Sequence, residues 1–341
     1  MAHTPFTSIP LIDISGLYSA DLAERQRVAD ELGRAAREVG FLQVTGHGIA
    51  RVLRAGLIEQ ARRFFARPLE EKMRFYIGQS SNHSGYVPEG EEQFVGGSKD
   101  LKEAYDVNFD YTQAPQTFPL LGPNQWPDAE AFRREVSAYY HEALALGTTL
   151  FRGFALALGL PEDTFAAITR QPTSQLRMIH YPLDPDPVAD RPGIGAHTDY
   201  ECFTILLPTA EGLQVCNSEG EWIDVPLIDD AFVINIGDML EVLSNGNFVA
   251  TLHRVRKVRE ERFSFPLFCA CDYDTRIAPI AGLPLRGERA YSAVVCGDHL
   301  FAQTVQTFAY LRRRLEAGTL QLPDGSLGLS SFGHAQVEVA P

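Results

Sequence analysis

The chain has 341 residues, of which 45% are hydrophobic and 22% are charged. This composition is ordinary for a globular protein, and the length is sufficient to bury a large core. The formal net charge of −14 disfavours DNA or RNA as a partner, because binding phosphates needs a basic surface. No segment is long and apolar enough to predict a membrane span, and no secretory leader is visible, so a membrane protein is not expected.

The five cysteines are odd in number and show no C-x-x-C spacing. A disulfide framework is therefore not expected, and a reducing compartment fits this usage. From these features we expect a cytoplasmic protein.

Helices and strands alternate in the N-terminal half. The periodicity predicts a strand at 9–15, a helix at 21–39, a strand at 41–48, a helix at about 50–66 and a third helix beginning at Pro68. Residues 77–100 are rich in Gly, Ser, Asn and Glu and are expected to form a loop; whether it covers a site is left open. A strand at 103–111, a proline-rich connector at 115–127 and a long helical region at about 128–160 follow.

Short β-prone runs dominate the chain from residue 174. They lie at 174–181, 195–199, 202–207, 212–216, 231–236, 251–258 and 262–270. Many short strands separated by turn residues predict a barrel or a double-sheet jelly roll. A helix at about 298–316 ends the pattern. We expect a mostly helical segment at 1–170, a β core at 171–285 and a C-terminal helical segment at 286–341.

His197-Thr198-Asp199 is the only H-x-D sequence in the chain. Residues two apart on a strand point to the same side, so one imidazole and one carboxylate can reach one metal ion. His253 is the best third ligand, because it lies in another β-prone run. Two histidines and one carboxylate leave open positions on an octahedral ion, which suits iron(II) that must bind a co-substrate and O₂.

The spacing alone is weak evidence, because nine histidines and 44 acidic residues should produce an H-x-D/E sequence about once by chance. The sequence context strengthens it. Glycines at 193 and 195 allow close backbone approach before His197. Turn signals at Gly237-Asp238 and at 244–246 predict hairpins before His253.

Arg262-Phe263-Ser264 follows nine residues after His253. The Arg and Ser side chains share one strand face, and a guanidinium with a hydroxyl makes a good carboxylate receptor. Tyr181, just before Pro182, is a candidate third contact through its phenol. The alternative for Arg262 is an exposed arginine balanced by Glu260 and Glu261.

Several of these segments together resemble a known family. They are GFLQVTGHGI (40–49), LRMIHYP (176–182), GIGAHTDYECFTILL (193–207), NIGDMLEVLSNG (235–246), LHRV (252–255) and RFSFPLF (262–268). The set resembles the isopenicillin N synthase-like branch of the iron(II)/2-oxoglutarate-dependent dioxygenases, over about residues 9–315. Ile179 departs from it, because many plant members have an asparagine there that lies near the co-substrate.

The resemblance implies an α+β fold, with a double-stranded β-helix (jelly roll) core, an N-terminal helical domain and a C-terminal helix. It implies that His197, Asp199 and His253 bind iron(II), and that Arg262, Ser264 and Tyr181 bind the distal carboxylate of 2-oxoglutarate. The implied reaction uses O₂, releases succinate and CO₂, and hydroxylates, desaturates or cyclises a small molecule. Two alternatives stay open: an oxidase of the isopenicillin N synthase or ethylene-forming type, and a non-catalytic cupin-like metal-binding protein.

Four aromatic residues are candidate substrate contacts. Phe268 shares a strand face with Arg262 and Ser264, provided that the strand stays regular through Pro266. Tyr86, Tyr105 and Tyr200 are weaker candidates from expected loop and strand ends. Core packing is the alternative for each of them. Neither the substrate nor the oligomeric state follows from the sequence.

Overall fold

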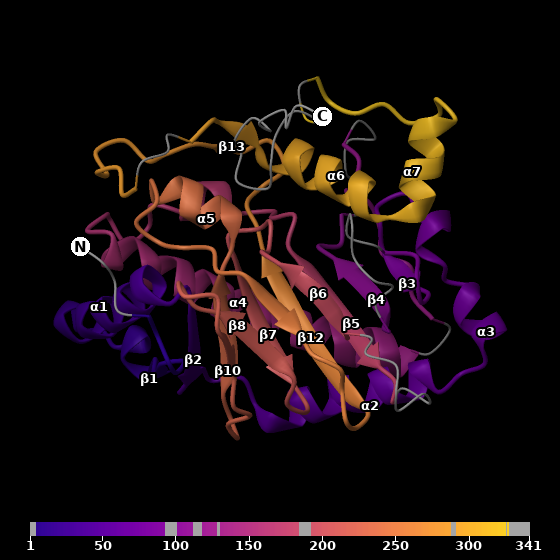
Figure 1. Ribbon diagram of the computed structural model, residues 1–341, viewed down its shortest axis with the longest axis horizontal. Coiled ribbons are helices and arrows are strands. Elements are labelled where there is room, and N and C mark those ends of the chain that lie inside the picture. The colour runs from indigo at the N-terminus through magenta and orange to yellow at the C-terminus, as the bar shows by residue number, and fades with distance from the viewer. Residues whose placement is uncertain are drawn as a thin grey trace.

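The computed structural model describes residues 5–92, 101–111, 118–127, 130–183, 192–287, 291–324 and 326. Its α-helices are α1 (Leu22–Glu38), α2 (Arg51–Phe65), α3 (Leu69–Met73), α4 (Glu130–Ala157), α5 (Asp238–Leu243), α6 (Cys296–Thr307) and α7 (Ala309–Glu316). Short 3-10 helices lie at Ser15–Tyr18, Ile77–Gln79 and Ala166–Ile168. Figure 1 shows these helices around a central sheet.

The central sheet has eight strands in the order β1-β2-β10-β7-β12-β5-β4-β3. They are β1 (Leu11–Asp13), β2 (Phe41–Thr45), β3 (Gly85–Val87), β4 (Glu103–Asn108), β5 (Gln175–Tyr181), β7 (Phe203–Pro208), β10 (Phe232–Ile236) and β12 (Arg262–Cys269). Among the strand pairs of this sheet that the structure describes, β1–β2 alone is parallel and the others are antiparallel. The sheet combines strands from before and after residue 170, so the proposed domain division at that residue crosses its hydrogen-bonded ladder.

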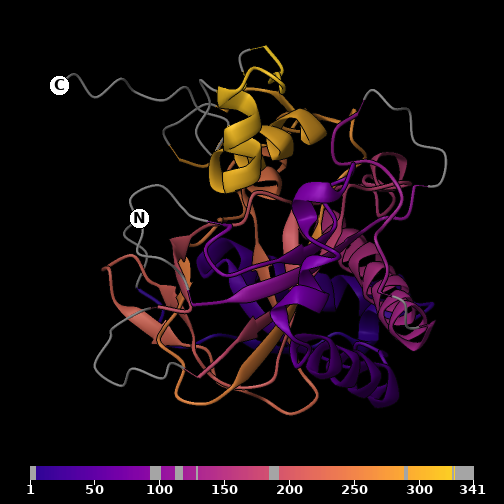
Figure 2. The ribbon, with the colours of Figure 1, turned by 90° about the vertical axis from the view of Figure 1, so that its right-hand side faces the viewer.

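A second sheet contains β6 (Ile194–His197), β11 (His253–Val255), β8 (Leu213–Cys216) and β9 (Trp222–Asp224), in that order. Leu213 and Val215 of this sheet pack in one buried cluster with Leu206 and Val233 of the central sheet. The two sheets therefore face each other, as Figure 2 shows. A two-stranded ribbon of β13 (Arg276–Ile277) and β14 (Val294–Val295) precedes α6.

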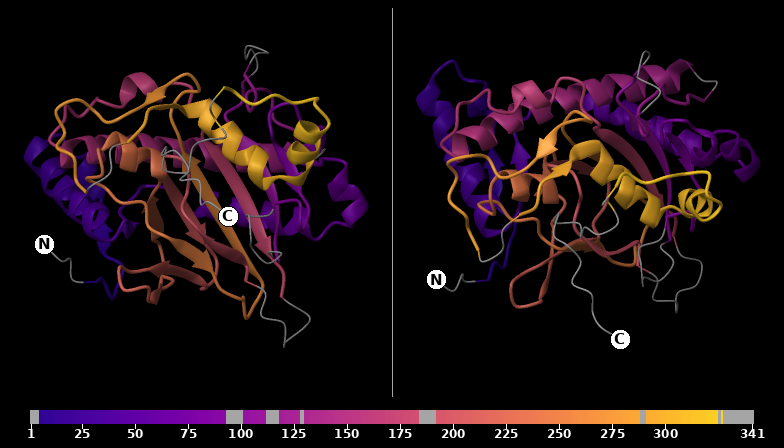
Figure 3. Two further views of the ribbon diagram at one scale, coloured as in Figure 1. Left: turned by 45° about the horizontal axis from the view of Figure 1, so that its top comes forward. Right: turned by 90° about the horizontal axis from the view of Figure 1, so that it is seen from above.

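Helices α1, α2 and α4 cover the other face of the central sheet (Figure 3). The ring of Phe203 on β7 lies 4.7 Å from that of Phe151 and 5.3 Å from that of Phe154, both on α4. Burial of aromatic rings of this size contributes about 1.5–3 kcal/mol each, so this contact is a main attachment of the helical layer. Helices α6 and α7 lie across one end of the two sheets, at the top of Figure 1.

The predicted order of elements is confirmed over most of the chain, with α1 capped by the Asp21 side chain and ended at Gly40, whose φ is +72°. Leu22, the first residue of α1, is 54% exposed. Strand β11 covers only three residues of the expected 251–258 run.

Three local predictions are wrong. The expected loop at 77–100 contains strand β3, which pairs with β4; residues 93–100 lie outside the described residues. The expected hairpins at 237–238 and 244–246 are instead the two ends of α5. The expected single C-terminal helix is two helices, because Phe308 takes an extended conformation with ψ of 124°.

Candidate active site

The two histidines of the predicted triad face each other across a strand pair. His197 ends β6 and His253 begins β11, and the antiparallel register places them directly opposite. Their ring centroids lie 4.3 Å apart. Asp199 follows β6 by two residues, in a turn whose backbone carbonyl accepts a hydrogen bond from the Asp238 amide of α5. Helix α5, which the sequence did not predict, therefore fixes the carboxylate ligand.

The ligand atoms of His197, Asp199 and His253 all lie within 4.8 Å of one another. The Nε2 atoms of His197 and His253 are 3.6 Å and 3.5 Å from Oδ1 of Asp199. The Nδ1 atoms lie 2.8 Å from the Gly195 carbonyl and 3.1 Å from the Thr251 carbonyl. Because each carbonyl accepts a hydrogen bond from Nδ1–H, each Nε2 has a lone pair available for a metal ion.

The two carboxylate oxygens of Asp199 have different neighbours. Oδ2 accepts a hydrogen bond from the Thr204 hydroxyl and another from the Asn235 amide at 2.7 Å, which leaves Oδ1 facing the histidines. Burial alone would raise the pKa of Asp199, but His253, His197 and Thr204 lower it below its usual value. Burial lowers the pKa of His197 to about 4. A carboxylate beside an uncharged imidazole is what a divalent cation needs.

Removal of either donor to Oδ2 is expected to weaken iron(II) binding by about 10- to 100-fold, as for other groups that orient a metal ligand. Thr204→Val and Asn235→Ala should both show this loss in a competition titration against a chelator. Thr204→Ser keeps the hydroxyl and should bind iron(II) as the wild type does. Equal affinity in all four proteins would show that the two donors do not position Asp199.

Arg262, Ser264 and Tyr181 also come together. The register pairs Arg262 with Tyr181 across β12 and β5, and the guanidinium lies 4.8 Å from the centre of the Tyr181 ring. The Ser264 hydroxyl donates to the Tyr181 phenol at 3.4 Å. Nε of Arg262 donates to the Ala210 carbonyl at 3.1 Å, but its buried Nη1 has no hydrogen-bond partner among the described residues. A buried guanidinium nitrogen without a partner fits a group that binds a carboxylate.

Gly193 allows β6 and β11, which carry the two histidines, to approach Tyr181. A Cβ at Gly193 would lie 2.9 Å from both the Tyr181 ring and the Val255 side chain, so only glycine fits there without movement. Ile194 of β6 and Val255 of β11 pack in one buried cluster with Tyr181. The strands that carry the two histidines therefore pack against the strand that carries the predicted carboxylate receptor.

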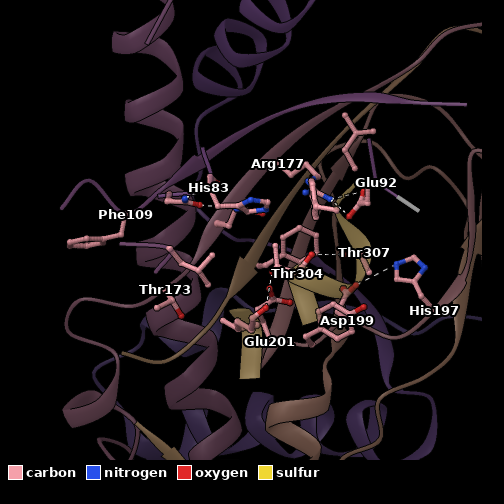
Figure 4. Close-up of a pocket in the computed structure, with 18 of the residues that line it drawn as sticks. His83, Glu92, Phe109, Thr173, Arg177, His197, Asp199, Glu201, Thr304 and Thr307 are labelled. Atoms are coloured by element: carbon pink, nitrogen blue, oxygen red, sulfur yellow. Dashed lines mark hydrogen bonds and ion pairs between the residues drawn. The ribbon is translucent and has the colours of Figure 1, made fainter. Parts of the chain in front are cut away.

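A cavity of about 110 Å³ adjoins the triad, with His197 and Asp199 in its wall. Figure 4 shows the side chains that surround it. Its apolar wall includes Phe109, Leu120, Ile179, Phe268, Leu300 and Phe308, and its charged wall includes Glu92, Lys102, Arg177 and Glu201. This combination of apolar surface and a few polar groups is typical of a small-molecule site.

The four aromatic candidates divide into two pairs. Phe268 and Tyr200 line the cavity. Tyr86 and Tyr105 lie instead in the aromatic core around Phe64, with ring centroids 5.9 Å and 4.8 Å from it. Their hydroxyls donate to Glu103 and to the Gln125 carbonyl, so both are satisfied there and we do not propose them as substrate contacts.

A buried ion network forms part of the cavity wall. Arg177 donates to both oxygens of Asp106 at 2.8 Å and to Glu92 at 2.8 and 3.0 Å. Lys102 pairs with the same Glu92 at 2.7 Å. Two cations thus face two carboxylates, and each of the four charges has a partner of opposite sign, as a buried network requires.

Glu201, two residues after Asp199, also lines the cavity. Burial raises its pKa to about 8, and the charge of Asp199 adds to the effect. No ion pair joins its carboxylate to a Lys, Arg or His of the described ranges.

His83 connects the cavity to the C-terminal helices. Its Nδ1 lies 2.6 Å from the Tyr310 hydroxyl, and its ring meets Phe308 edge-on at 4.4 Å. Burial lowers the pKa of His83 to about 3, and nearby Arg177 adds to this shift. The side chain is therefore neutral in the folded protein at neutral pH.

The lowered pKa of His83 predicts a loss of stability in acid. Below an unfolded-state pKa of about 6.5, the unfolded chain binds a proton that the folded protein excludes, so stability falls as the pH drops from about 6.5 toward about 3. The contribution is at most about 1.4 kcal/mol per pH unit. His83→Asn, which tolerates the φ of +56° at this position, removes it. Urea unfolding at several pH values should show a shallower acid slope for the variant; parallel curves would contradict this account.

Several site residues were missed in the sequence, namely Thr204, Asn235, Glu92, Lys102, Arg177 and Glu201. Two of them left a signal: Asn235 interrupts the apolar run FVINI, and Arg177 lies within the apolar strand LRMIHY. A buried polar residue in an apolar strand needs a hydrogen-bond partner, so such a residue is a candidate for a buried polar network. The partners themselves come from other strands and could not be identified from spacing.

Comparison with known proteins agrees with this geometry. Residues 172–270 match the family described as the 2OG-Fe(II) oxygenase superfamily, and residues 9–129 match the N-terminal region described for non-haem dioxygenases in morphine synthesis. The rice homoarginine-6-hydroxylase is 36% identical over 327 residues, covering 89% of this chain and 98% of the relative. The chain belongs to the 2OG-Fe(II) oxygenase superfamily.

Two further relatives are similar to this chain over most of its length. A 2-oxoglutarate-Fe(II) type oxidoreductase of Emericella nidulans is 35% identical, covering 77% of this chain and 79% of the relative. The crystal structure of Neurospora crassa T7H with alpha-KG and thymine superimposes with a TM-score of 0.75 at 25% identity, covering 91% of this chain and 97% of that one. The predicted α+β jelly-roll fold is confirmed, as is the expectation of an iron- and 2-oxoglutarate-dependent oxidoreductase.

Among the described residues, none of the helices combines the length and apolar character that crossing a bilayer requires.

Proposed function

We propose that His197, Asp199 and His253 bind iron(II), and that Arg262 and Ser264, assisted by Tyr181, bind the distal carboxylate of 2-oxoglutarate. The enzyme then oxidises a C–H bond of a small molecule that occupies the cavity beside the triad, by hydroxylation, desaturation or ring closure. The observation that supports this most directly is the triad itself, with three ligand atoms within 4.8 Å on two separate β segments.

The residues of the chain have separate tasks in this proposal. The triad provides two imidazole nitrogens and one carboxylate oxygen and leaves the rest of the metal's coordination sphere open. Arg262 orients the co-substrate through its carboxylate, and the apolar wall with Phe268 and Phe308 excludes water from the reacting C–H bond. Bound iron supplies the activation of O₂ that no side chain provides.

The proposal is tested in two steps. Titration of 2-oxoglutarate into the anaerobic iron(II) protein should produce a metal-to-ligand charge-transfer band. Admission of O₂ with a substrate panel should then release succinate. The isopenicillin N synthase type of oxidase needs no 2-oxoglutarate, and a cupin-like binding protein shows no turnover; the matches to 2-oxoglutarate-dependent relatives favour neither. Absence of both band and succinate from iron-loaded protein would overturn the proposal.

The names of the relatives suggest where a substrate panel should begin. The rice relative is named for homoarginine, and the Neurospora structure contains thymine. Both are small polar molecules, which agrees with a small-molecule partner for this cavity. We also propose a cytoplasmic location, supported by the five free cysteines.

A further inference from the structure

Each carboxyl group of the described cavity wall has a cationic partner in the protein or in the proposed complex, except Glu201. Arg177 and Lys102 are paired with Asp106 and Glu92 at 2.7 to 3.0 Å, so that network carries no net charge. In the proposed complex, Asp199 and one carboxylate of 2-oxoglutarate offset the two charges of iron(II). The other carboxylate offsets Arg262.

Glu201 is therefore the remaining carboxylate in the cavity wall that has no cation among the described residues. In Figure 4 it lies on the same side of the view as Asp199, away from Arg177 and Glu92. Arg177 could turn to Glu201 only by leaving Asp106 unpaired in a buried position, which would cost several kcal/mol. Lys102 could do so only by leaving Arg177 to balance both Asp106 and Glu92.

The rest of the cavity wall indicates what kind of substrate surface would lie beside a group bound to Glu201. Side chains of Phe109, Ile179, Phe268 and Leu300 present apolar surface. Thr304 and Thr307 lie in the part of the wall formed by α6, but their hydroxyls donate to the carbonyls of Leu300 and of Gln303 and Thr304 within that helix. Because both hydroxyls already donate within α6, the Glu201 carboxylate is the main polar group near them that can bind a substrate cation.

We propose that the primary substrate carries a cationic nitrogen, an amine or a guanidine on an apolar body, and that the carboxylate of Glu201 binds this nitrogen. The inference rests on the proposed function, because the charge count assumes bound iron(II) and 2-oxoglutarate. A cation would be held by a charge-assisted hydrogen bond in a site from which water is excluded. The same site would disfavour an anionic substrate, because it would face Glu201 and Asp199 together.

Matched probes test the proposal on the full chain loaded with iron(II) and 2-oxoglutarate without O₂. Calorimetric titration compares butylguanidine with butylurea, and pentylamine with 1-pentanol; each pair matches a cation with a neutral molecule of similar size. We expect the wild type to bind the cationic member of each pair more tightly. Glu201→Gln should weaken cation binding by about 10- to 100-fold and remove the preference.

Two variants control for general effects of the substitution. Glu219→Gln removes an exposed carboxylate of the β8–β9 turn and should keep the wild-type preference. Glu201→Asp keeps the charge and should keep a weaker preference, which a merely structural role would not produce. The charge-transfer band of each variant shows whether iron and 2-oxoglutarate are bound.

The outcomes separate this inference from the proposed function. A wild type that forms the charge-transfer band but binds neither cationic probe, or binds the neutral members equally well, would overturn the cationic substrate and leave the oxygenase assignment standing. A preference for cations that persists in Glu201→Gln would overturn the role of Glu201. Failure to form the band in the wild type would instead overturn the proposed function.

Discussion

Replacement of Asp199 by alanine is expected to abolish stoichiometric iron(II) binding and to reduce 2-oxoglutarate turnover to background. Its Oδ1 lies 3.6 Å and 3.5 Å from the two histidine Nε2 atoms, and it is the only carboxylate of the described residues that forms a three-residue metal-ligating group with them. Without it, two neutral imidazoles would have to bind a divalent cation with no compensating negative charge.

Metal content after anaerobic reconstitution and gel filtration measures this effect directly, and the charge-transfer band with 2-oxoglutarate gives a second measure. Asp274→Ala is the matched control, because it removes an exposed carboxylate from the segment after β12. The control should bind one iron per chain. An Asp199→Ala protein that retains one tightly bound iron would show that the metal lies elsewhere.

Arg262→Met is expected to weaken 2-oxoglutarate binding by about 30- to 5,000-fold, from a loss of about 2–5 kcal/mol on removing one partner of a buried charge pair. Arg262 is 1% exposed, and its Nη1 has no partner among the described residues, so this nitrogen is available to bind a ligand. Arg262→Lys should also bind poorly, because an ammonium group cannot match two carboxylate oxygens.

Arg262→Met should not destabilise the protein in the absence of 2-oxoglutarate. Burial lowers the pKa of Arg262, which reports the cost of keeping this charge out of water. A methionine of similar length removes that cost, so the melting temperature of the ligand-free variant should equal or exceed that of the wild type. Only the wild type should gain further stability when 2-oxoglutarate is added.

Thermal melts with and without 2-oxoglutarate, together with titration of the charge-transfer band, measure both effects. Arg276→Met, on the exposed side of β13, is the control for loss of a positive charge. A variant that melts well below the wild type and binds 2-oxoglutarate normally would mean that Arg262 stabilises the fold and does not bind the co-substrate.

The site could be anticipated from the sequence where its geometry follows from local periodicity. His197 and Asp199, like Arg262 and Ser264, are two residues apart, so a strand or its end places each pair on one side. Pairing of His197 with His253 needed only that their two segments be neighbours in a sheet. Phe268 also kept its face, because β12 continues through Pro266 without interruption.

The failures occur where the structure depends on contacts between distant segments. Helix α5 carries turn-forming residues at both ends, and its position is fixed by backbone hydrogen bonds to Asp199 and Glu201 that no local pattern reveals. Tyr86 and Tyr105 were candidate substrate contacts because they lie in an expected loop and near the end of an expected strand. Pairing of β3 with β4 instead buries both rings against Phe64.

The sequence by itself determined the family, the order of most elements and the candidate ligand residues, because these depend on residue type and on spacing along single strands. Tertiary structure alone decided which oxygen of Asp199 faces the two histidines. It also decided that, among the described residues, Nη1 of Arg262 has no partner and Glu201 has no cation. Each of these depends on side chains from separate strands and helices meeting in a buried place, where an unpaired charge is costly and its position becomes informative.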